Sequence, residues 1–247
     1  MLNQERVQAS ERPAEEQVIP SNWWVRKFIK GLIRILAAVL LKLKFEGLEN
    51  FPKTGGVIMA TNHMSQADTA ILLLNPVRDD QAALVADKYK KHPLISIIVK
   101  SQPHFWIDRS RADFAALRGA IGYLKDGGTL GIAPEGTRSK SGALIEGKPG
   151  AVLLAVKAEV PIVAVSIAGT ENFRKNVARF KRTAVTVRFS KPFYLPPLDP
   201  ADRSGSLQRT TEEIMCQIAA QLPDRYHGVY AGHPRIQEIR QETGREA

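Results

Sequence analysis

A histidine and an aspartate five residues apart form the pair in this chain best suited to proton transfer. His63 and Asp68 lie in the run Asn-His-Met-Ser-Gln-Ala-Asp at 62–68. A carboxylate that fixes the tautomer of an imidazole and stabilises the imidazolium makes histidine an effective general base. In the alternative interpretation, Ser65 and Asp68 only cap a helix and His63 is an incidental turn residue. These residues alone favour neither interpretation.

The flanking sequence predicts how the two side chains are positioned. The run 57–61 is strand-like, and Ser65 with Asp68 three residues later has the pattern of a capping box at the start of a helix. On one continuous helix, His63 and Asp68 would point about 140° apart, since each residue advances roughly 100°. We therefore predict that His63 lies on the turn between strand and helix, and that the Asp68 carboxylate folds back to the imidazole.

Two other segments suit an anionic ligand, although each signal is weak by itself. The apolar run 105–107 ends in Asp108 and Arg109, and ligands of α/β folds bind at the carboxyl ends of strands. The planar guanidinium of Arg109 suits a phosphate, but for this residue taken alone a surface ion pair with Asp108 or Asp113 is the stronger explanation. The glycine-containing segment 147–151 resembles the start of a helix whose N-terminus favours an anion.

A richer loop follows the predicted strand at 129–133. It carries an acid, a glycine, a hydroxyl and an arginine in succession. Gly136 lets the backbone approach a ligand closely. Thr137 and Arg138 suit phosphate oxygens, and Glu135 is placed to order the arginines or a substrate hydroxyl. A merely polar exit from a strand would not explain so many functional groups at one strand end.

The composition limits the classes of site and partner. A single cysteine, Cys216, excludes an intrachain disulfide and a cysteine-based metal cluster, and we expect it to be buried. The five histidines show no ligand-like pairing, so neither a metal nor a cofactor is expected. The formal net charge of +10 indicates an anionic partner: nucleic acid, a membrane surface or a phosphorylated substrate. Because we find no nucleic-acid recognition motif, nucleic acid is the weakest of these.

The N-terminal region is expected to contact an anionic membrane surface. Residues 1–21 are polar and predict a flexible leader, whereas 22–45 predict an amphipathic helix with six cations opposite its apolar face. Its uncharged run is far shorter than the roughly 20 residues that span a bilayer, so a helix lying in the interface fits best. The alternative is a helix packed on its own domain. The residues expected at the membrane are Trp23, Trp24, Lys27, Lys30 and Arg34.

The rest of the chain alternates β-like and α-like segments. This pattern predicts an α/β fold with a mostly parallel central sheet flanked by helices, preceded by the N-terminal basic amphipathic helix. Strands are predicted at 56–61, 82–87, 104–107, 129–133, 162–167 and 184–189. Helices are predicted at 65–74, 93–100, 113–125, 150–158 and 206–222. One domain, 46–232, is expected to hold the chemistry, and the charged tail 233–247 is expected to fray or remain disordered.

Taken in order, these segments resemble the four sequence blocks of the glycerophospholipid acyltransferase family. The matching positions are Asn62, His63, Ser65 and Asp68 in the first block, 107–109 in the second, 134–139 in the third and 160–165 in the fourth. The departures lie at packing positions, where Ala133 replaces an aromatic residue, Ala164 a proline and Pro103 a glycine. The resemblance covers roughly residues 45–195.

The resemblance implies an O-acyltransferase of phospholipid biosynthesis. Such an enzyme moves a fatty acyl group from a thioester, acyl-CoA or acyl-carrier protein, to the free hydroxyl of lysophosphatidic acid, giving phosphatidic acid. His63 would take the hydroxyl proton with Asp68 in support, and a backbone amide near Gly136 would stabilise the oxyanion. Since acceptor and product are amphiphiles, a peripheral or monotopic enzyme at the cytoplasmic face of the membrane is implied. The residues implied to bind substrate are Arg109, Glu135, Gly136, Thr137 and Arg138.

Two rival functions remain open from the sequence. The same chemistry can act on another acceptor, such as a lysophospholipid, a glycolipid or an aminolipid. Alternatively, the chain is a non-catalytic membrane-binding protein of the same fold that uses its basic face for anionic lipids. The intact set of His63, Asp68, Glu135 and Arg138 argues against the second possibility. The oligomeric state is not indicated.

Overall fold

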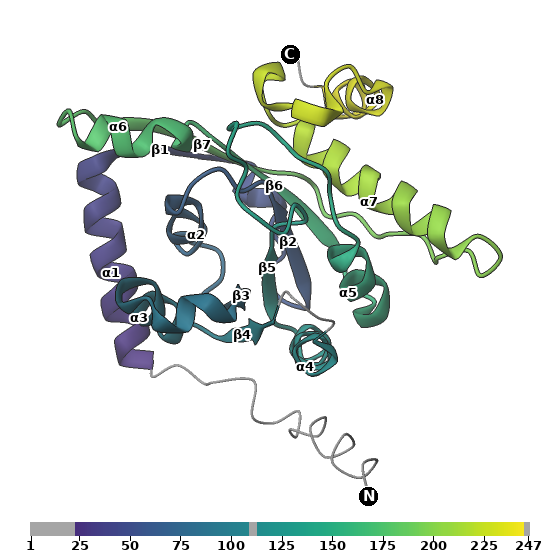
Figure 1. Cartoon of the computed structure of the whole chain (residues 1–247), viewed down its shortest axis with the longest axis horizontal. Coiled ribbons are helices and arrows are strands. Elements are labelled where there is room, and N and C mark those ends of the chain that lie inside the picture. The colour runs from purple at the N-terminus through teal and green to yellow at the C-terminus, as the bar shows by residue number, and fades with distance from the viewer. Residues whose placement is uncertain (1–22, 109–112, 245–247) are drawn as a thin grey trace, which may run out of the picture.

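The computed structural model describes residues 23–108 and 113–244 (Figure 1). The predicted leader at 1–21, Arg109 and the last three residues of the predicted tail lie outside the described residues. The described chain forms an α/β fold around a seven-stranded sheet, which confirms the predicted fold class.

Five parallel strands form the centre and one side of the sheet. The strand order is β1-β7-β6-β2-β5-β3-β4, with β6, β2, β5, β3 and β4 parallel to one another. Strand β7 is antiparallel to β6, and β1 is parallel to β7. The strands are β1 (Leu41–Glu46), β2 (Val57–Thr61), β3 (Gln81–Ala86), β4 (His104–Ile107), β5 (Thr129–Ile132), β6 (Ile162–Ala168) and β7 (Thr183–Phe189).

Helices cover both faces of this sheet. In Figure 1, α1, α2 and α3 lie on one side of the sheet and α4, α5 and α7 on the other. The helices are α1 (Trp23–Leu40), α2 (Ala67–Leu72), α3 (Pro93–Lys100), α4 (Phe114–Lys125), α5 (Gly150–Ala158), α6 (Phe173–Val177), α7 (Arg203–Ala219) and α8 (Pro234–Thr243). The predicted elements match these bounds to within a few residues, whereas β1, α6 and α8 were not predicted.

The central strand β2 shows why the buried strands are recognisable as apolar runs. All five of its residues are buried. Val57 and Met59 belong to the core cluster on the α2 side, and Ile58 and Ala60 to the cluster that contains α4, α5 and α7. A parallel strand covered on both faces is apolar throughout rather than alternating. This strand delivers the turn at 62–66 to the carboxyl edge of the sheet.

The N-terminal helix ends earlier than expected. The prediction that a helix continues to residue 45 is wrong, because β1 begins at Leu41 and pairs in parallel with β7. In β1, Leu41, Leu43 and Phe45 alternate with polar residues, the period of a strand. The guanidinium of Arg182 donates to the carbonyl oxygens of Ala38 and Leu41 and so caps the C-terminal end of α1.

One of the predicted membrane residues does not face outward. Trp23, Trp24, Lys27 and Arg34 are exposed, and Trp24 keeps 73% of its surface. Lys30 is buried, and its Nζ lies 2.9 Å from Oδ1 of an aspartate in the loop before β3, Asp79. The expectation that Lys30 points to a membrane is therefore wrong, because its charge is already paired.

The C-terminal tail is folded over most of its length. The expectation that the tail from residue 233 frays is wrong, because α8 packs against α7 through the buried side chains of Ile236 and Ile239. The buried guanidinium of Arg240 donates to the Leu222 carbonyl at 2.9 Å and to Asp224 at 2.8 Å. Although most residues of α8 are polar, two buried isoleucines and one hydrogen-bonded arginine are enough to pack it against the domain.

Candidate active site

The turn that carries His63 is anchored to the neighbouring strand β6. The side chain of Asn62 is buried, and its two polar atoms hydrogen-bond the backbone of a single β6 residue, Ile167. Nδ2 donates to the carbonyl of Ile167 at 2.9 Å, and Oδ1 accepts from the amide of the same residue at 2.8 Å. A bidentate amide contact of this kind fixes where the chain leaves β2.

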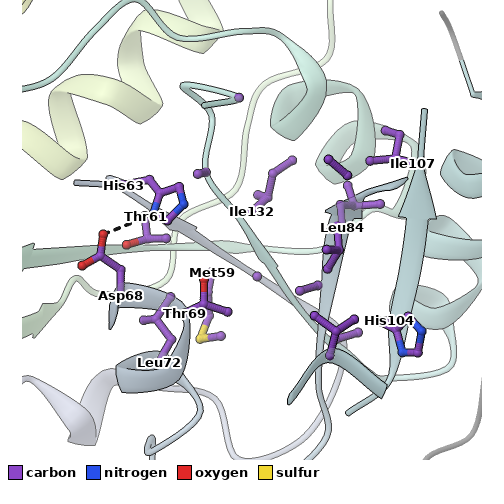
Figure 2. Close-up of a pocket in the computed structure, with 18 of the residues that line it drawn as sticks. Met59, Thr61, His63, Asp68, Thr69, Leu72, Leu84, His104, Ile107 and Ile132 are labelled. Atoms are coloured by element: carbon purple, nitrogen blue, oxygen red, sulfur yellow. Dashed lines mark hydrogen bonds and ion pairs between the residues drawn. The ribbon is translucent and has the colours of Figure 1, made fainter. Parts of the chain in front are cut away.

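His63 and Asp68 form the pair that the sequence predicts. Nδ1 of His63 lies 3.1 Å from Oδ2 of Asp68, whose carboxylate is buried (Figure 2). The same oxygen accepts from the backbone amides of Met64 and Ser65, both at 2.7 Å. Because an ionised carboxylate only accepts hydrogen bonds, Nδ1 carries the proton and Nε2 is left as the acceptor. The predicted fold-back of the carboxylate is confirmed.

The capping box forms only in part. The Asp68 carboxylate reaches back to the Ser65 amide as expected, but the Ser65 hydroxyl accepts from Ala67 at 3.2 Å. The amide of Asp68 bonds the carbonyl oxygen of Ser65 at 3.3 Å. The helix α2 therefore begins at Ala67, two residues later than predicted.

The loop after β5 holds the backbone of His63 on both sides. Oε1 of Glu135 accepts from the His63 amide at 2.8 Å, and the Ser139 amide donates to the His63 carbonyl at 2.8 Å. Oε2 of Glu135 accepts from the amide of Ile145 at 3.2 Å. Two segments more than seventy residues apart are joined at the histidine in this way.

Glu135 thus has a different place from the one expected. Its side chain is 1% exposed and lies outside the residues that line the adjacent cavity. Burial raises the pKa of its carboxyl group to about 6, although the two amide hydrogen bonds act in the opposite direction. The carboxylate positions His63 through the backbone and, because it does not line the cavity, is not placed to bind a substrate hydroxyl there.

Gly136 makes a tight turn and leaves room for a lysine. Its φ of +67° lies in the left-handed region, and a Cβ at this position would lie 3.1 Å from Cδ of Lys148. Its amide donates to the carbonyl of Ala133 at 2.9 Å. The sequence predicts that a backbone amide near Gly136 stabilises an oxyanion. The amide of Gly136 itself is already hydrogen-bonded within the loop.

Three polar side chains from the connection after β5 line the exposed end of the cavity beside His63. Thr137, Arg138 and Lys148 are exposed and line the cavity that His63 also lines. Lys148 was missed as a single residue, although the segment 147–151 was recognised as a weak anion site. The structure brings its ammonium group to the loop that carries Arg138, and two cations at one place suit an anionic group.

The cavity has a volume of about 460 Å³ and runs along the face of the sheet covered by α2 and α3. Met59, Gly131, Ala83 and His104 occupy one register row across β2, β5, β3 and β4, and all four line it. Gly131 has no side chain in the middle of a strand, which leaves the floor low at that point. The shape suits a long, narrow apolar group.

Beside His63, the described part of the chain offers neither a cysteine thiol nor a set of metal ligands. Cys216 is buried on α7, as predicted, and burial raises the pKa of its thiol to about 12. Within residues 23–108 and 113–244, no group of three His, Cys, Asp or Glu side chains is placed to bind a metal ion. No described helix has the length and apolar character needed to cross a bilayer.

Comparison with known proteins agrees with this geometry. A protein named 1-acyl-sn-glycerol-3-phosphate acyltransferase from Borreliella burgdorferi is 29% identical over 135 residues, 54% of each chain. One of the same name from Limnanthes douglasii is 29% identical over 167 residues, 66% of this chain and 56% of the relative. The chain thus spans little more than half the length of these relatives.

A solved structure has the same fold. The crystal structure of the 1-acyl-sn-glycerophosphate (LPA) acyltransferase PlsC from Thermotoga maritima aligns with a TM-score of 0.55 and 27% identity. The alignment covers 86% of this chain and 81% of that one. The family model described as Acyltransferase matches residues 42–168, which include His63, Asp68 and the loop at 133–139. Because this match covers more than half of the sequence, the chain belongs to the acyltransferase family.

Proposed function

We propose that the protein transfers a fatty acyl group from a thioester to the free hydroxyl of lysophosphatidic acid, giving phosphatidic acid. One observation carries the proposal. The His63–Asp68 pair lies where a long apolar cavity meets the exposed cations Arg138 and Lys148. An acyl chain and a phosphate on opposite sides of a general base are what this reaction requires. The names of the similar proteins from Borreliella burgdorferi and Limnanthes douglasii support the same acceptor.

The mechanism uses the free ring nitrogen of His63. Nε2 takes the proton of the acceptor hydroxyl while the hydroxyl oxygen attacks the thioester carbonyl carbon. Collapse of the tetrahedral adduct breaks the carbon–sulfur bond, and the imidazolium returns the proton to the leaving thiolate. The buried carboxylate of Asp68 stabilises the imidazolium between these steps. We favour direct transfer, because the buried Cys216 lies on α7 and Ser65 is engaged in the turn.

The acceptor phosphate is assigned to the cations at the exposed end of the cavity. The guanidinium of Arg138 and the ammonium of Lys148 supply the charge, and the Thr137 hydroxyl supplies a further hydrogen bond. Arg109 lies outside the described residues and remains a predicted second arginine at this site.

The acyl chain of the donor is assigned to the apolar cavity. The cavity follows β2 from the level of Val57 to the level of Thr61. These five residues are four steps apart end to end, or about 13 Å at roughly 3.3 Å per step. A fatty acyl chain occupies half of a bilayer's hydrocarbon core of about 30 Å. The cavity therefore accommodates most of one chain, with its carbonyl end beside His63. Both acyl-CoA and acyl-carrier protein remain candidate donors.

The exposed side of α1 is assigned to the lipid surface. Phe28, Ile35 and Val39 each keep more than three fifths of their surface, and Trp24 lies at the start of the same helix. The opposite side of α1 packs Ile33 against Leu73 and Leu74, in a cluster that Ile98 of α3 joins. Leu73 and Ile98 also line the cavity, so one layer of side chains separates α1 from it. A helix lying in the membrane interface would hold the cavity close to its amphiphilic substrates.

The central test measures free thiol released from an acyl thioester with lysophosphatidic acid present and absent. Wild-type protein is expected to release thiol only with the acceptor, and His63→Ala to be slower by about 10²- to 10⁴-fold. Parallel reactions with acyl-CoA and acyl-carrier protein identify the donor, and a panel of acceptors identifies the alcohol. Near-wild-type turnover by His63→Ala would refute the base assignment. Vesicle binding without any turnover would favour the non-catalytic alternative.

The phosphate assignment predicts a selective defect. Arg138→Ala and Lys148→Ala are each expected to raise the KM for lysophosphatidic acid by about tenfold, with little change in the KM for the thioester. Lys181→Ala, at an exposed lysine after α6, is the matched control. An unchanged acceptor KM in both variants would contradict the assignment.

The membrane assignment is tested by sedimentation with anionic vesicles of phosphatidylglycerol and phosphatidylcholine. Phe28→Ser and Ile35→Ser should weaken binding, because each removes an apolar side chain exposed on α1. Val229→Ser makes a similar change at a residue that is 66% exposed far from α1 and should have no effect. Equal binding by all variants would show that α1 does not contact lipid.

A further inference from the structure

The connection between β5 and α5 is held by a segment much later in the chain. Residues 226–230, which lie between α7 and α8, form hydrogen bonds with residues 144–147 of this connection (Figure 1). The family model ends at residue 168, so the later segment lies outside the part of the chain that the model matches. The contacts between the two segments are therefore not implied by membership of the family.

Three hydrogen bonds join the two segments. The amide of Leu144 donates to the carbonyl of Tyr226 at 2.8 Å, and the carbonyl of Leu144 accepts from the amide of Val229 at 3.2 Å. The third bond comes from a side chain, because the hydroxyl of Tyr230 accepts from the amide of Gly147 at 3.0 Å. A substitution can therefore remove this third bond and leave the two backbone bonds in place.

The packing around these bonds is close. Gly228 has a φ of +56°, and a Cβ at this position would collide with the carbonyl oxygen of Leu144. A Cβ at Gly147 would lie 2.7 Å from Cγ of Met215 on α7. The side chain of Tyr230 is itself 7% exposed. Because a buried amide needs a partner and water has little access here, the hydroxyl is the group that satisfies Gly147.

Gly147 immediately precedes Lys148, the lysine assigned to the acceptor phosphate. The amide of Lys148 donates to the carbonyl of Pro134 at 2.8 Å. A Cβ at Gly136 would lie 3.1 Å from Cδ and 3.4 Å from Nζ of Lys148, so the lysine side chain lies against this glycine. The backbone that carries the lysine is thus fixed by Pro134 on one side and by Tyr230 on the other. Its position decides where the ammonium group lies beside the loop after β5.

We propose that Tyr230 is a positioning residue for the acceptor, because its hydroxyl holds the Gly147 amide and so keeps Lys148 where it binds the acceptor phosphate. The inference rests on the proposed function, since it requires that phosphate to bind at Lys148. Without the hydroxyl, the Gly147 amide loses its partner and the held arrangement becomes less populated. A ligand that needs this arrangement then binds more weakly in proportion.

Steady-state kinetics of Tyr230→Phe on the full chain, with lysophosphatidic acid and acyl-CoA, test the proposal. The KM for lysophosphatidic acid should rise by about three- to fivefold, less than in Lys148→Ala, whereas kcat and the KM for acyl-CoA should stay within about twofold. Tyr123→Phe is the matched control, because it removes a tyrosine hydroxyl that donates to the carbonyl of Asp80, remote from the lysine, and it should change neither KM. An unchanged KM for lysophosphatidic acid in Tyr230→Phe would overturn the proposal.

A double-mutant cycle separates positioning from a general loss of structure. In the Lys148→Ala background, Tyr230→Phe should change the KM for lysophosphatidic acid by less than about twofold, because no ammonium group is left to position. A purely structural role would lower the Tm and affect both substrates equally, whether or not Lys148 is present. Increases in the KM for lysophosphatidic acid that are equal in the two backgrounds would overturn the proposal.

The outcomes also separate this inference from the proposed function. If Lys148→Ala raises the KM for lysophosphatidic acid and Tyr230→Phe does not, only this inference fails. If Lys148→Ala leaves that KM unchanged, the assignment of the phosphate to this lysine fails and this inference fails with it. If no acyl thioester is turned over, the proposed function itself fails.

Discussion

Replacing Glu135 by glutamine tests whether the buried carboxylate positions His63. The carboxylate accepts one hydrogen bond on each oxygen, from the His63 amide and from the Ile145 amide. A glutamine has the same shape, but its NH₂ group cannot accept, so one of the two amides loses its partner. Leaving a buried donor unpaired costs about 1–3 kcal/mol.

The charge that the variant removes has the opposite effect on stability. A rise in the pKa of Glu135 from 4.5 to about 6 means that its ionised form is less stable in the folded protein by about 2 kcal/mol. Because the folded pKa is the higher one, the wild-type protein is more stable to unfolding in acid, where Glu135 is protonated, than at neutral pH. This extra stability is fully present below about pH 4.5 and is lost as the pH rises through about 6. The glutamine variant lacks this titration.

The two effects nearly cancel at neutral pH but not in acid. At about pH 7.5, the free energies of unfolding of the variant and the wild type should differ by about 1 kcal/mol or less. Near pH 4.5, the free energy of unfolding of the variant, relative to that of the wild type, should be lower by about a further 2 kcal/mol. At neutral pH its kcat/KM should nevertheless fall by about tenfold or more, because a small displacement of a catalytic group is costly.

Urea unfolding at both pH values and initial rates of thiol release check these outcomes. Glu146→Gln, at an exposed glutamate of the same connection, is the control and should change neither quantity. A kcat/KM of Glu135→Gln within about twofold of wild type would refute the positioning role. A wild-type-to-variant difference in unfolding free energy that is equal at both pH values would refute the charge argument.

Three other substitutions test contacts of the same site and of α1. Asn62→Ala should lower the free energy of unfolding by about 2–4 kcal/mol in urea, because it strips two buried hydrogen bonds from Ile167; a change below about 1 kcal/mol would contradict this. Lys30→Met should leave binding to anionic vesicles unchanged, because its ammonium pairs with Asp79, and weaker sedimentation would show otherwise. Gly131→Leu should shift the preferred acyl-CoA to a shorter chain, because its Cβ would lie 3.7 Å from Cε of Met59 and the rest would fill the cavity; an unaltered chain-length profile would place the acyl chain elsewhere.

Much of the fold could be predicted because its signals are local. The helices 93–100 and 150–158 match α3 and α5 residue for residue. Pro93 occupies the first turn of α3, and the Asp113 side chain caps α4 by accepting from the Ala116 amide. Such signals act within one turn of the helix that they start, so no knowledge of the tertiary structure is needed.

The misplaced segments depend on distant partners. Leu40 and Leu43 fit a helical period, whereas Leu41, Leu43 and Phe45 fit a strand period, and only the pairing with β7, about 140 residues later, makes 41–46 a strand. The tail has few apolar residues, but Ile236 and Ile239 find a surface on α7. In both cases the deciding contact lies in a part of the chain that a local pattern does not describe.

The same division holds for the site. The sequence by itself determined the pair of His63 and Asp68, because a turn of a few residues brings them together wherever the strand lies. Only the tertiary structure decided that Glu135 holds His63 by its backbone, that Lys148 lies beside Gly136, and that Lys30 is paired rather than exposed. These contacts join segments that the strand order places side by side. The free energy of such a contact depends on burial and on the partner, and neither is encoded in the residues next to it.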